Sequence, residues 1–129
     1  VIAVDCLTSN VKNAIYPTIK HDFTRGIFKT SPVDLVYCVE VAEHIDEMYV
    51  DNLLASLAHG KFVLMTHALP GQSGHHHVNL QPQGYWLEKL ALYGLQMLPE
   101  DTAKVRAIAD QEGSPYIGQT GMVLANRNL

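Results

Sequence analysis

The chain has 129 residues, enough to bury one hydrophobic core of ordinary size, so we predict a single domain over residues 1–129. Hydrophobic residues at 47% and charged residues at 17% are typical of a folded globular protein and argue against disorder. The formal net charge of -4 argues against a broad basic face for nucleic acid, so a small molecule is the favoured partner.

Two short strands are predicted at the start of the chain, and an acidic residue follows each of them. The first is Val1–Val4, and it stops at Asp5. The second is Ile15–Ile19, where Pro17 removes a hydrogen-bond donor and therefore favours an edge position in a sheet. Asp22 closes this second segment. Both acids are therefore expected near the carboxyl end of a strand.

A third strand is predicted at Leu35–Val39, whose apolar, β-branched and aromatic residues are typical of a strand buried on both faces of a parallel sheet. Two glutamates and a histidine follow it, namely Glu40, Glu43 and His44. In open α/β sheets the ligand crevice lies at the carboxyl ends of the strands. The acidic cluster is therefore expected at the ligand-binding edge.

The middle of the chain is predicted to form a helix, a strand and a long loop. Apolar residues recur at helical spacing from Glu47 to Ala58, and Gly60 ends this helix. Lys61–His67 is predicted as another buried strand. In the loop that follows, prolines and glycines prevent regular structure, and His75–His77 are three consecutive histidines. This loop is expected at the same edge of the sheet as the acids.

The C-terminal third is predicted to alternate helices and strands, with residues 111–119 as a connection. The four expected elements are a helix at 82–93, a strand at 95–98, a helix at 99–110 and a strand at 121–125. Pro82 and Pro99 each suit the start of a helix. Strands and helices in this order predict an α/β fold, with a sheet flanked by helices.

The two cysteines, Cys6 and Cys38, do not suggest a secreted disulfide framework, because Cys38 falls inside a predicted strand and behaves as a small buried hydrophobic residue. No apolar run approaches the roughly 20 residues that cross a bilayer as a helix. We therefore predict a cytoplasmic protein with no membrane partner.

The motif EVAEHI after a buried strand, and the later strand and loop KFVLMTHALPGQSGHHHVN, resemble the class I S-adenosylmethionine-dependent methyltransferases. The similarity is greatest to the subgroup with E-V-x-E-H, which includes ubiquinone-biosynthesis O-methyltransferases and small-RNA 3′-terminal 2′-O-methyltransferases. It extends from Val1 to about Ala125 and is sharpest at Glu40–Ile45 and Leu69–Asn79. The resemblance implies a Rossmann-like sheet and S-adenosylmethionine as cofactor.

The resemblance also implies roles for residues that follow the strands. Asp5, with its neighbour Cys6, matches the position of the acid that binds the ribose hydroxyls of the cofactor, and a carboxylate accepts two hydroxyl donors well. Asp22 and Phe23 match the residues that hold the adenine. Glu40 would lie beside the methionine half of the cofactor.

One feature of that family has no counterpart in this sequence. The family's first strand and the glycine-rich turn after it are missing, because Val1 starts where the family starts its second strand. In the family's sheet the first strand is central, so its loss would leave two inner edges unpaired. We expect roughly 40 to 60 residues of a normal domain to be absent from the sequence, supplied by a partner chain or homo-oligomer, or replaced by altered pairing.

The resemblance to the small-RNA enzymes implies a metal site built from Glu40, Glu43, His44 and one of the loop histidines, with His75 and His77 as candidates. Mixed oxygen and nitrogen donors suit a divalent Mg, Mn, Fe or Zn ion. In the alternative reading, Glu43 and His44 simply begin the next helix and the three histidines form a solvated loop. Without a metal, His44 or His75 would act as the catalytic base that accepts a proton from the substrate hydroxyl.

These observations lead to one main hypothesis and two alternatives. The main hypothesis is an S-adenosylmethionine-dependent O-methyltransferase acting on a small hydroxylated acceptor, such as a sugar or a phenol. The first alternative is a metal-assisted RNA terminal-ribose 2′-O-methyltransferase, which the acidic composition disfavours. The second is a non-catalytic methyltransferase-like binding or assembly module, which the missing glycine-rich turn would favour.

Overall fold

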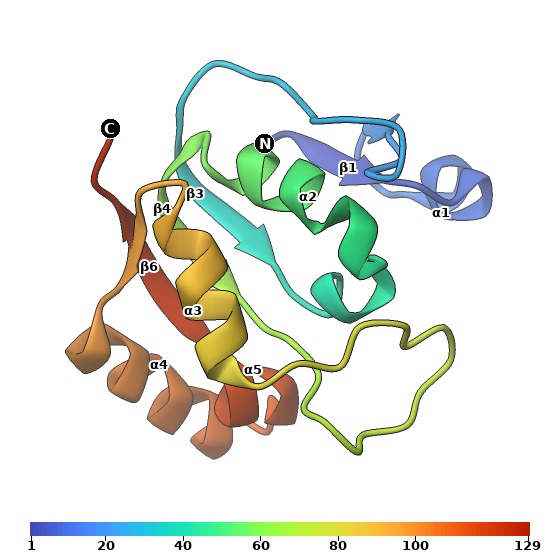
Figure 1. Ribbon diagram of the computed structural model, residues 1–129. Coiled ribbons are helices and arrows are strands. Elements are labelled where there is room, and N and C mark those ends of the chain that lie inside the picture. Colours follow the sequence, from blue (N-terminus) through green and yellow to red (C-terminus); the bar gives the residue numbers. More distant parts are fainter.

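The computed structural model describes residues 1–129, and its larger sheet has four strands in the order β3–β4–β6–β5 (Figure 1). β3 (Val33–Cys38) and β4 (Gly60–Met65) run parallel, and α2 (Val50–Leu57) provides the crossover that a parallel pair needs. β6 (Met122–Asn126) runs antiparallel to both β4 and β5 (Leu95–Met97). The predicted α/β fold with a sheet flanked by helices is confirmed.

Helices occupy the connections in the second half of the chain. α3 (Gln83–Ala91) follows a proline directly and α4 (Pro99–Gln111) begins with one, as the sequence predicts. The expectation of a plain connection at Gln111–Gln119 is wrong, because this stretch contains the short helix α5 (Pro115–Thr120). Pro115 lies in its first turn, where the missing N–H has no helical partner to lose. None of the helices combines the length and the apolar character needed to cross a bilayer.

The N-terminal strands form a separate parallel sheet. β1 (Ala3–Asp5) pairs with β2 (Thr18–Lys20), and α1 (Thr8–Asn13) connects them. The register places Asp5 opposite Lys20 at the carboxyl end of the pair. Figure 1 shows that β1 and β3 run in the same general direction, so the residues that follow these strands leave toward the same side of the molecule.

A cleft divides the two sheets. β1 pairs only with β2, and β3 pairs only with β4, so each has one unpaired edge. An apolar cleft of about 380 Å³ lies between them, and residues from both strands, such as Val4 and Leu35, line it. This is where the family resemblance would place a further strand.

α2 and α3 cover one face of the larger sheet (Figure 1). The side chains between them and the sheet form the hydrophobic core, with Leu54 and Trp86 from the helices and Val63, Met65 and Leu124 from the strands. All five are fully buried. Burying an aliphatic side chain of this size contributes about 1.5–3 kcal/mol, so this layer holds the sheet and its edge in place.

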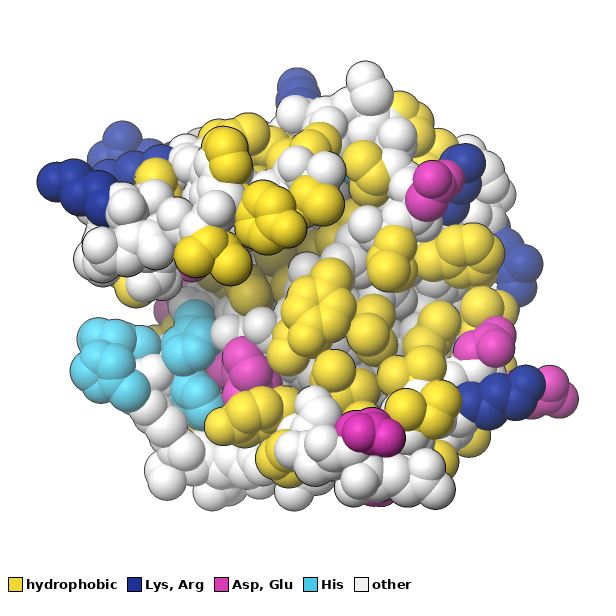
Figure 2. Space-filling model, turned by 180° about the vertical axis from the view of Figure 1, so that it is seen from behind, with side chains coloured by type: hydrophobic (Ala, Val, Ile, Leu, Met, Phe, Trp, Pro, Cys, Tyr) yellow, Lys and Arg dark blue, Asp and Glu magenta, His cyan; other side chains and the backbone are white.

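The other face of β3 and β4 is open. Leu35, Tyr37 and Phe62 expose 59%, 63% and 49% of their surface, whereas their neighbours Cys38 and Val63 point into the core. Figure 2 shows hydrophobic side chains gathered on this side. The expectation that β3 is buried on both faces is therefore wrong, because helices cover only one face of this strand.

Candidate functional site

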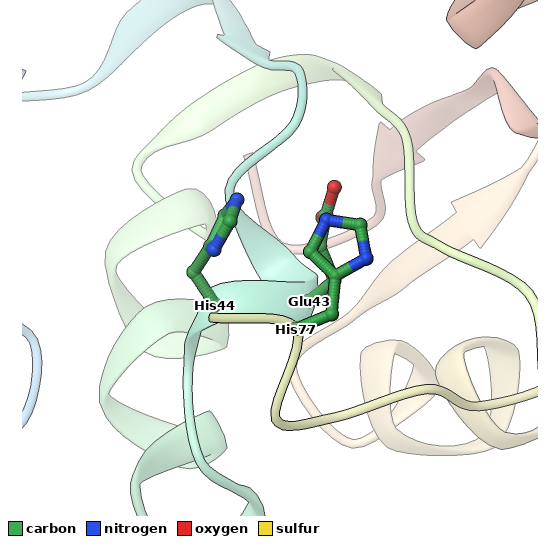
Figure 3. Close-up of side chains that lie close together, drawn as sticks. All are labelled: Glu43, His44 and His77. Atoms are coloured by element: carbon green, nitrogen blue, oxygen red, sulfur yellow. The ribbon is translucent and has the colours of Figure 1, made fainter. Parts of the chain in front are cut away.

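Three side chains suited to bind a metal ion converge beyond the carboxyl end of β3 (Figure 3). Glu43 and His44 lie on the 3₁₀ turn η1 (Ala42–His44), and His77 lies on the loop after β4. One ligand atom from each residue lies within 4.8 Å of the others. Because β3 and β4 are parallel neighbours, the segments that follow them meet at the same edge of the sheet.

Hydrogen bonds tie the histidine loop to this turn. The backbone N–H groups of Val78 and Asn79 both donate to the carbonyl oxygen of Glu43, at 2.9 and 3.1 Å. Nδ1 of His44 lies 3.0 Å from the carbonyl oxygen of His76. These contacts fix the loop against η1 and set the relative positions of the site residues.

Glu43 is completely buried, and neither of its carboxylate oxygens has a hydrogen-bond partner. Burial raises the pKa of Glu43, and the negative charge of nearby Glu40 raises it further. A buried carboxylate without a partner is costly unless it takes up a proton or faces a cation. The surroundings of Glu43 are therefore chemically suited to a divalent cation.

The histidines divide into two pairs. A carbonyl oxygen can only accept, so His44 must donate its Nδ1 proton to the oxygen of His76, and Nε2 of His44 is left with a free lone pair. The ring of His77 lies 5.0 Å from that of His44, and its Nδ1 is buried without a partner. His75 instead contacts His76, with ring centroids 4.0 Å apart, and both are exposed. Of the two predicted loop candidates, the structure thus brings His77 into the cluster and leaves His75 outside it.

Glu40 has an unusual backbone conformation, with a φ of 58°. Residues other than glycine rarely adopt this left-handed region, and such positions are concentrated at functional sites. Thr66 holds the turn, because its Oγ1 accepts from the N–H of Glu40 at 2.9 Å and donates to Oε2 of Glu40 at 3.3 Å. The role of Thr66 was not predicted, because its place at the end of a predicted strand carries no local signal for this contact.

The residues assigned to the cofactor ribose lie at the carboxyl end of β1. The carboxylate of Asp5 accepts from the N–H of Leu7 at 2.8 Å and from Nδ2 of Asn10 at 3.0 Å, so it stabilises its own turn. Cys6 is exposed. Partial burial and the nearby negative charges of Asp5 and Asp22 raise the pKa of the Cys6 thiol. Asp5, Cys6 and Asp22 therefore share one neighbourhood.

The residues assigned to the adenine follow β2. Oδ1 of Asp22 accepts from both the N–H and the hydroxyl of Thr24, at 2.9 and 2.7 Å, and these bonds lower the pKa of Asp22. Phe23 packs against the hydrophobic core, and its ring is steeply inclined to that of His21, with the ring centroids 5.0 Å apart. Its carbonyl oxygen accepts from Nδ2 of Asn52 at 2.7 Å, which ties this loop to α2.

A cavity of about 600 Å³ lies beside the cluster, between the loop after β4 and α5. Glu40 and His77 lie on its wall, so the cavity is continuous with the site. The other lining residues are His67, Ala68, Gly71, Gln72, Ser73, Gly74, Pro115, Tyr116, Gln119 and Thr120. This cavity was not predicted from the sequence, because α5, which forms part of its wall, was not predicted; Pro115 is the available signal for that helix.

No protein-family model matches the sequence, and no curated protein matches it. Among solved structures, the fold is similar to that of a protein described as a pericyclic reaction enzyme, with a TM-score of 0.52 and 12% identity. It is also similar to LepI in complex with SAM, and to a single-residue variant of LepI in complex with SAH and a substrate analogue, each with a TM-score of 0.53 and 14% identity.

The similarity to each of these structures covers 76% of this chain but 31% of the other. The chain thus spans less than a third of the length of these proteins. At 12–14% identity the likeness shows a shared fold. The chain therefore shares a fold with part of LepI, a protein that was solved with SAM and with SAH.

Proposed function

We propose that the chain is part of an S-adenosylmethionine-dependent methyltransferase that methylates an oxygen of a small hydroxylated acceptor. The fold shared with LepI supports this, because LepI has been solved with SAM and with SAH. The observation that carries the proposal is the position of Glu40. Its carboxylate is held by Thr66 at the carboxyl end of β3, on the wall of a polar cavity. Ligands of open α/β sheets bind at this edge.

The residues assigned to the cofactor have suitable chemistry. Asp5 is the last residue of β1, and Asp22 follows its partner strand β2. The hydrogen bonds of Asp22 fall on Oδ1, so Oδ2 remains an acceptor. A carboxylate can accept from two ribose hydroxyls or from an exocyclic amine. When bound, S-adenosylmethionine supplies a sulfonium methyl group, which bonds to the acceptor oxygen while the electrons of the broken bond stay on sulfur. Glu40 would hold the charged methionine half through its carboxylate.

A histidine of the cluster is the proposed base. His44 is held by the carbonyl oxygen of His76, so its Nε2 lone pair is oriented and can take the proton of the acceptor hydroxyl. His75, the other base expected from the sequence, lies outside the cluster, and His77 is placed better for this role. The remaining contribution of the protein is to align oxygen, carbon and sulfur.

Calorimetric titration of the chain with SAH tests the cofactor assignment. We expect binding, and we expect Glu40→Gln to weaken it about tenfold or more, because a charged hydrogen-bonding partner is lost. Asp34→Asn is the matched control, since Asp34 lies on β3, the strand that precedes Glu40, but is exposed and paired with Lys61 at 2.8 Å. If SAH does not bind, or if Asp34→Asn weakens binding as much, the proposal is wrong. In the former case the chain would be better described as a non-catalytic binding or assembly module.

A second candidate function is metal-assisted 2′-O-methylation of a terminal RNA ribose. The cluster of Glu43, His44 and His77 favours it, because the buried Glu43 oxygens and His77 Nδ1 lack partners and suit a divalent ion. Glu40 is close enough to raise the pKa of Glu43 and could complete the ligand set. A metal held there would coordinate substrate hydroxyl groups and activate one of them as a nucleophile.

Titration with Co²⁺, followed by visible absorption, tests this site. We expect one Co²⁺ ion to bind per chain. Loss of a residue that only supports a metal ligand lowers metal affinity by about 10- to 100-fold, so we expect His77→Ala, which removes a ligand, to lower Co²⁺ affinity further. His75→Ala is the matched control, because this neighbouring histidine is exposed and lies outside the cluster. No Co²⁺ binding, or an equal loss in both variants, would exclude the metal-assisted function.

A further inference from the structure

Neutral polar groups dominate the wall of the 600 Å³ cavity, and only two of its twelve lining residues are hydrophobic. The carboxamides of Gln72 and Gln119 and the hydroxyls of Ser73, Tyr116 and Thr120 all line it. Each of these groups can both donate and accept hydrogen bonds. Small-molecule sites usually have mostly apolar walls with few polar groups. The cavity therefore suits a ligand that carries several hydroxyl groups.

The residue types absent from this wall exclude two other kinds of acceptor. No Lys or Arg lines the cavity, and its one carboxylate belongs to Glu40. Proteins hold phosphates chiefly through cationic side chains, so a nucleic-acid backbone is a poor match. Phenols need apolar and aromatic walls, and the single aromatic ring apart from the histidines belongs to Tyr116, which is 57% exposed.

Part of the cavity wall is already fixed by hydrogen bonds. Oε1 of Gln72 accepts from the N–H of Leu69 at 2.7 Å, and its Nε2 donates to Oε1 of Gln119 at 3.2 Å. This bond joins the loop to α5 and leaves Nε2 of Gln119 as a donor. On the inner side, Oγ1 of Thr120 accepts from the N–H of His67 at 3.2 Å. Groups held before binding lose less conformational entropy when a ligand arrives.

The cavity also reaches the reactive residues. Glu40 and His77 lie on its wall, and His77 belongs to the cluster that contains His44. His67 is 2% exposed, lines the cavity and has no hydrogen-bond partner at Nε2. A hydroxyl group of a ligand in the cavity would therefore lie close to the proposed base.

We propose that this cavity is the acceptor site and that the acceptor is a neutral, polyhydroxylated molecule of about monosaccharide size. The proposal rests on the methyltransferase function proposed above, and it names the substrate class of that site. Among the acceptors considered, the proposal favours a saccharide or a related polyol over a phenol and over the terminal ribose of an RNA.

Saturation-transfer NMR on the full chain tests this with four probes: D-glucose, myo-inositol, catechol and a single-stranded RNA trinucleotide. We expect the two polyols to bind more strongly than the other two. Gln119→Leu and Gln72→Leu should each weaken polyol binding about five- to tenfold, because each removes hydrogen bonds and leaves the shape similar. Gln111→Leu is the matched control, since Gln111 is exposed at the end of α4, outside the cavity.

Each outcome separates the acceptor proposal from the cofactor proposal. The proposed acceptor class is wrong if catechol or RNA binds more strongly than the polyols. It is also wrong if Gln111→Leu weakens polyol binding as much as Gln119→Leu does. If SAH binds but neither polyol does, the acceptor proposal falls while the cofactor assignment stands. If the polyols bind with the expected variant pattern and SAH does not, the cavity is a polyol site in a protein that is not a methyltransferase.

Discussion

Glu43 shows how a sequence motif becomes a site. From the motif EVAEHI alone, Glu43 could have been a solvent-exposed residue at the start of a helix. In the structure its side chain is completely buried, and its carboxylate oxygens have no hydrogen-bond partner. Native proteins seldom leave buried polar atoms in this state without a functional reason. The proposed metal site would provide such a reason, because ligand atoms of His44 and His77 lie within 4.8 Å of the Glu43 carboxylate.

The two cysteines are expected to differ in reactivity. Burial raises the pKa of Cys38 to about 12, so its thiol stays protonated near neutral pH, whereas Cys6 is exposed. We expect DTNB to titrate one thiol in the native protein and both in urea. Cys6→Ser should remove the native signal entirely. Two reactive thiols in the native chain would contradict the buried position of Cys38.

His67 is expected to make stability depend on pH. Burial lowers the pKa of His67, and the positive charge of Arg106 adds to this, so the unfolded chain binds this proton more readily than the folded one. The stabilising contribution is therefore complete above the ordinary imidazole pKa of about 6.5 and is lost as the pH falls below it.

Urea unfolding at a series of pH values, followed by the fluorescence of the single, fully buried Trp86, measures this effect. We expect the free energy of unfolding to decrease from about pH 6.5 downward. His67→Gln should flatten this decrease. An unchanged slope in the variant would assign the acid sensitivity to other groups.

At the scale of elements, the pairing of β3 with β4 depends on a close approach at Gly60. A Cβ atom added there would lie 2.7 Å from Cγ2 of Val36 and 2.7 Å from the carbonyl oxygen of Phe62. Gly60 pairs with Val33 at the start of the parallel ladder. The glycine thus allows α2 to turn directly into β4 against its neighbouring strand.

We expect Gly60→Ala to destabilise the protein by about 1–3 kcal/mol through overpacking. Gly84→Ala is the control, because Gly84 lies in α3 with no other atom within 4 Å of an added Cβ. Alanine there should stabilise the helix by up to about 1 kcal/mol. Chemical denaturation of both variants measures the difference, and a neutral Gly60→Ala would show that the strands can separate at this point.

Most helices and strands could be predicted from local sequence patterns. For the site, such patterns indicated only a set of candidate residues, and the structure shows which of them lie together. Prolines marked the starts of α3 and α4, but Pro115, the similar signal at the start of α5, belongs to a short stretch with no apolar periodicity. Which loop histidine joins the cluster depends on backbone geometry. His76 has a φ of 55°, and His77 after it lies in the cluster, but no sequence pattern among three identical residues predicts either feature.

At the scale of the whole molecule, the open face of the sheet is the feature that the sequence could not reveal. Leu35 and Tyr37 are exposed, whereas Val36 is partly buried and Cys38 is buried. The exposed residues are nevertheless apolar, so composition alone suggested burial on both faces. Large apolar patches on a surface mark contacts with other chains or a tendency to aggregate. The cleft beside β1 enlarges this apolar region.

We expect the chain to self-associate with increasing concentration, and the double variant Leu35→Thr, Tyr37→Thr to reduce this. Threonine retains strand propensity, and exposed positions contribute little packing, so stability should change by less than about 0.5 kcal/mol. Val63→Thr is the control on the buried face, where an unsatisfied hydroxyl should cost about 1–3 kcal/mol. Sedimentation velocity and thermal unfolding measure both effects, and association that persists in the double variant would point to another surface.

The place of β6 in the larger sheet has a consequence for biosynthesis. Met122–Asn126 are synthesised after both β4 and β5, yet they pair with β4 on one side and β5 on the other. Until β6 leaves the ribosome, β4 and β5 each have an unpaired edge, because β6 is the strand that lies between them. Such long-range closure is slow and exposes apolar segments to misassembly, so we expect this sheet to be open to chaperones until β6 emerges.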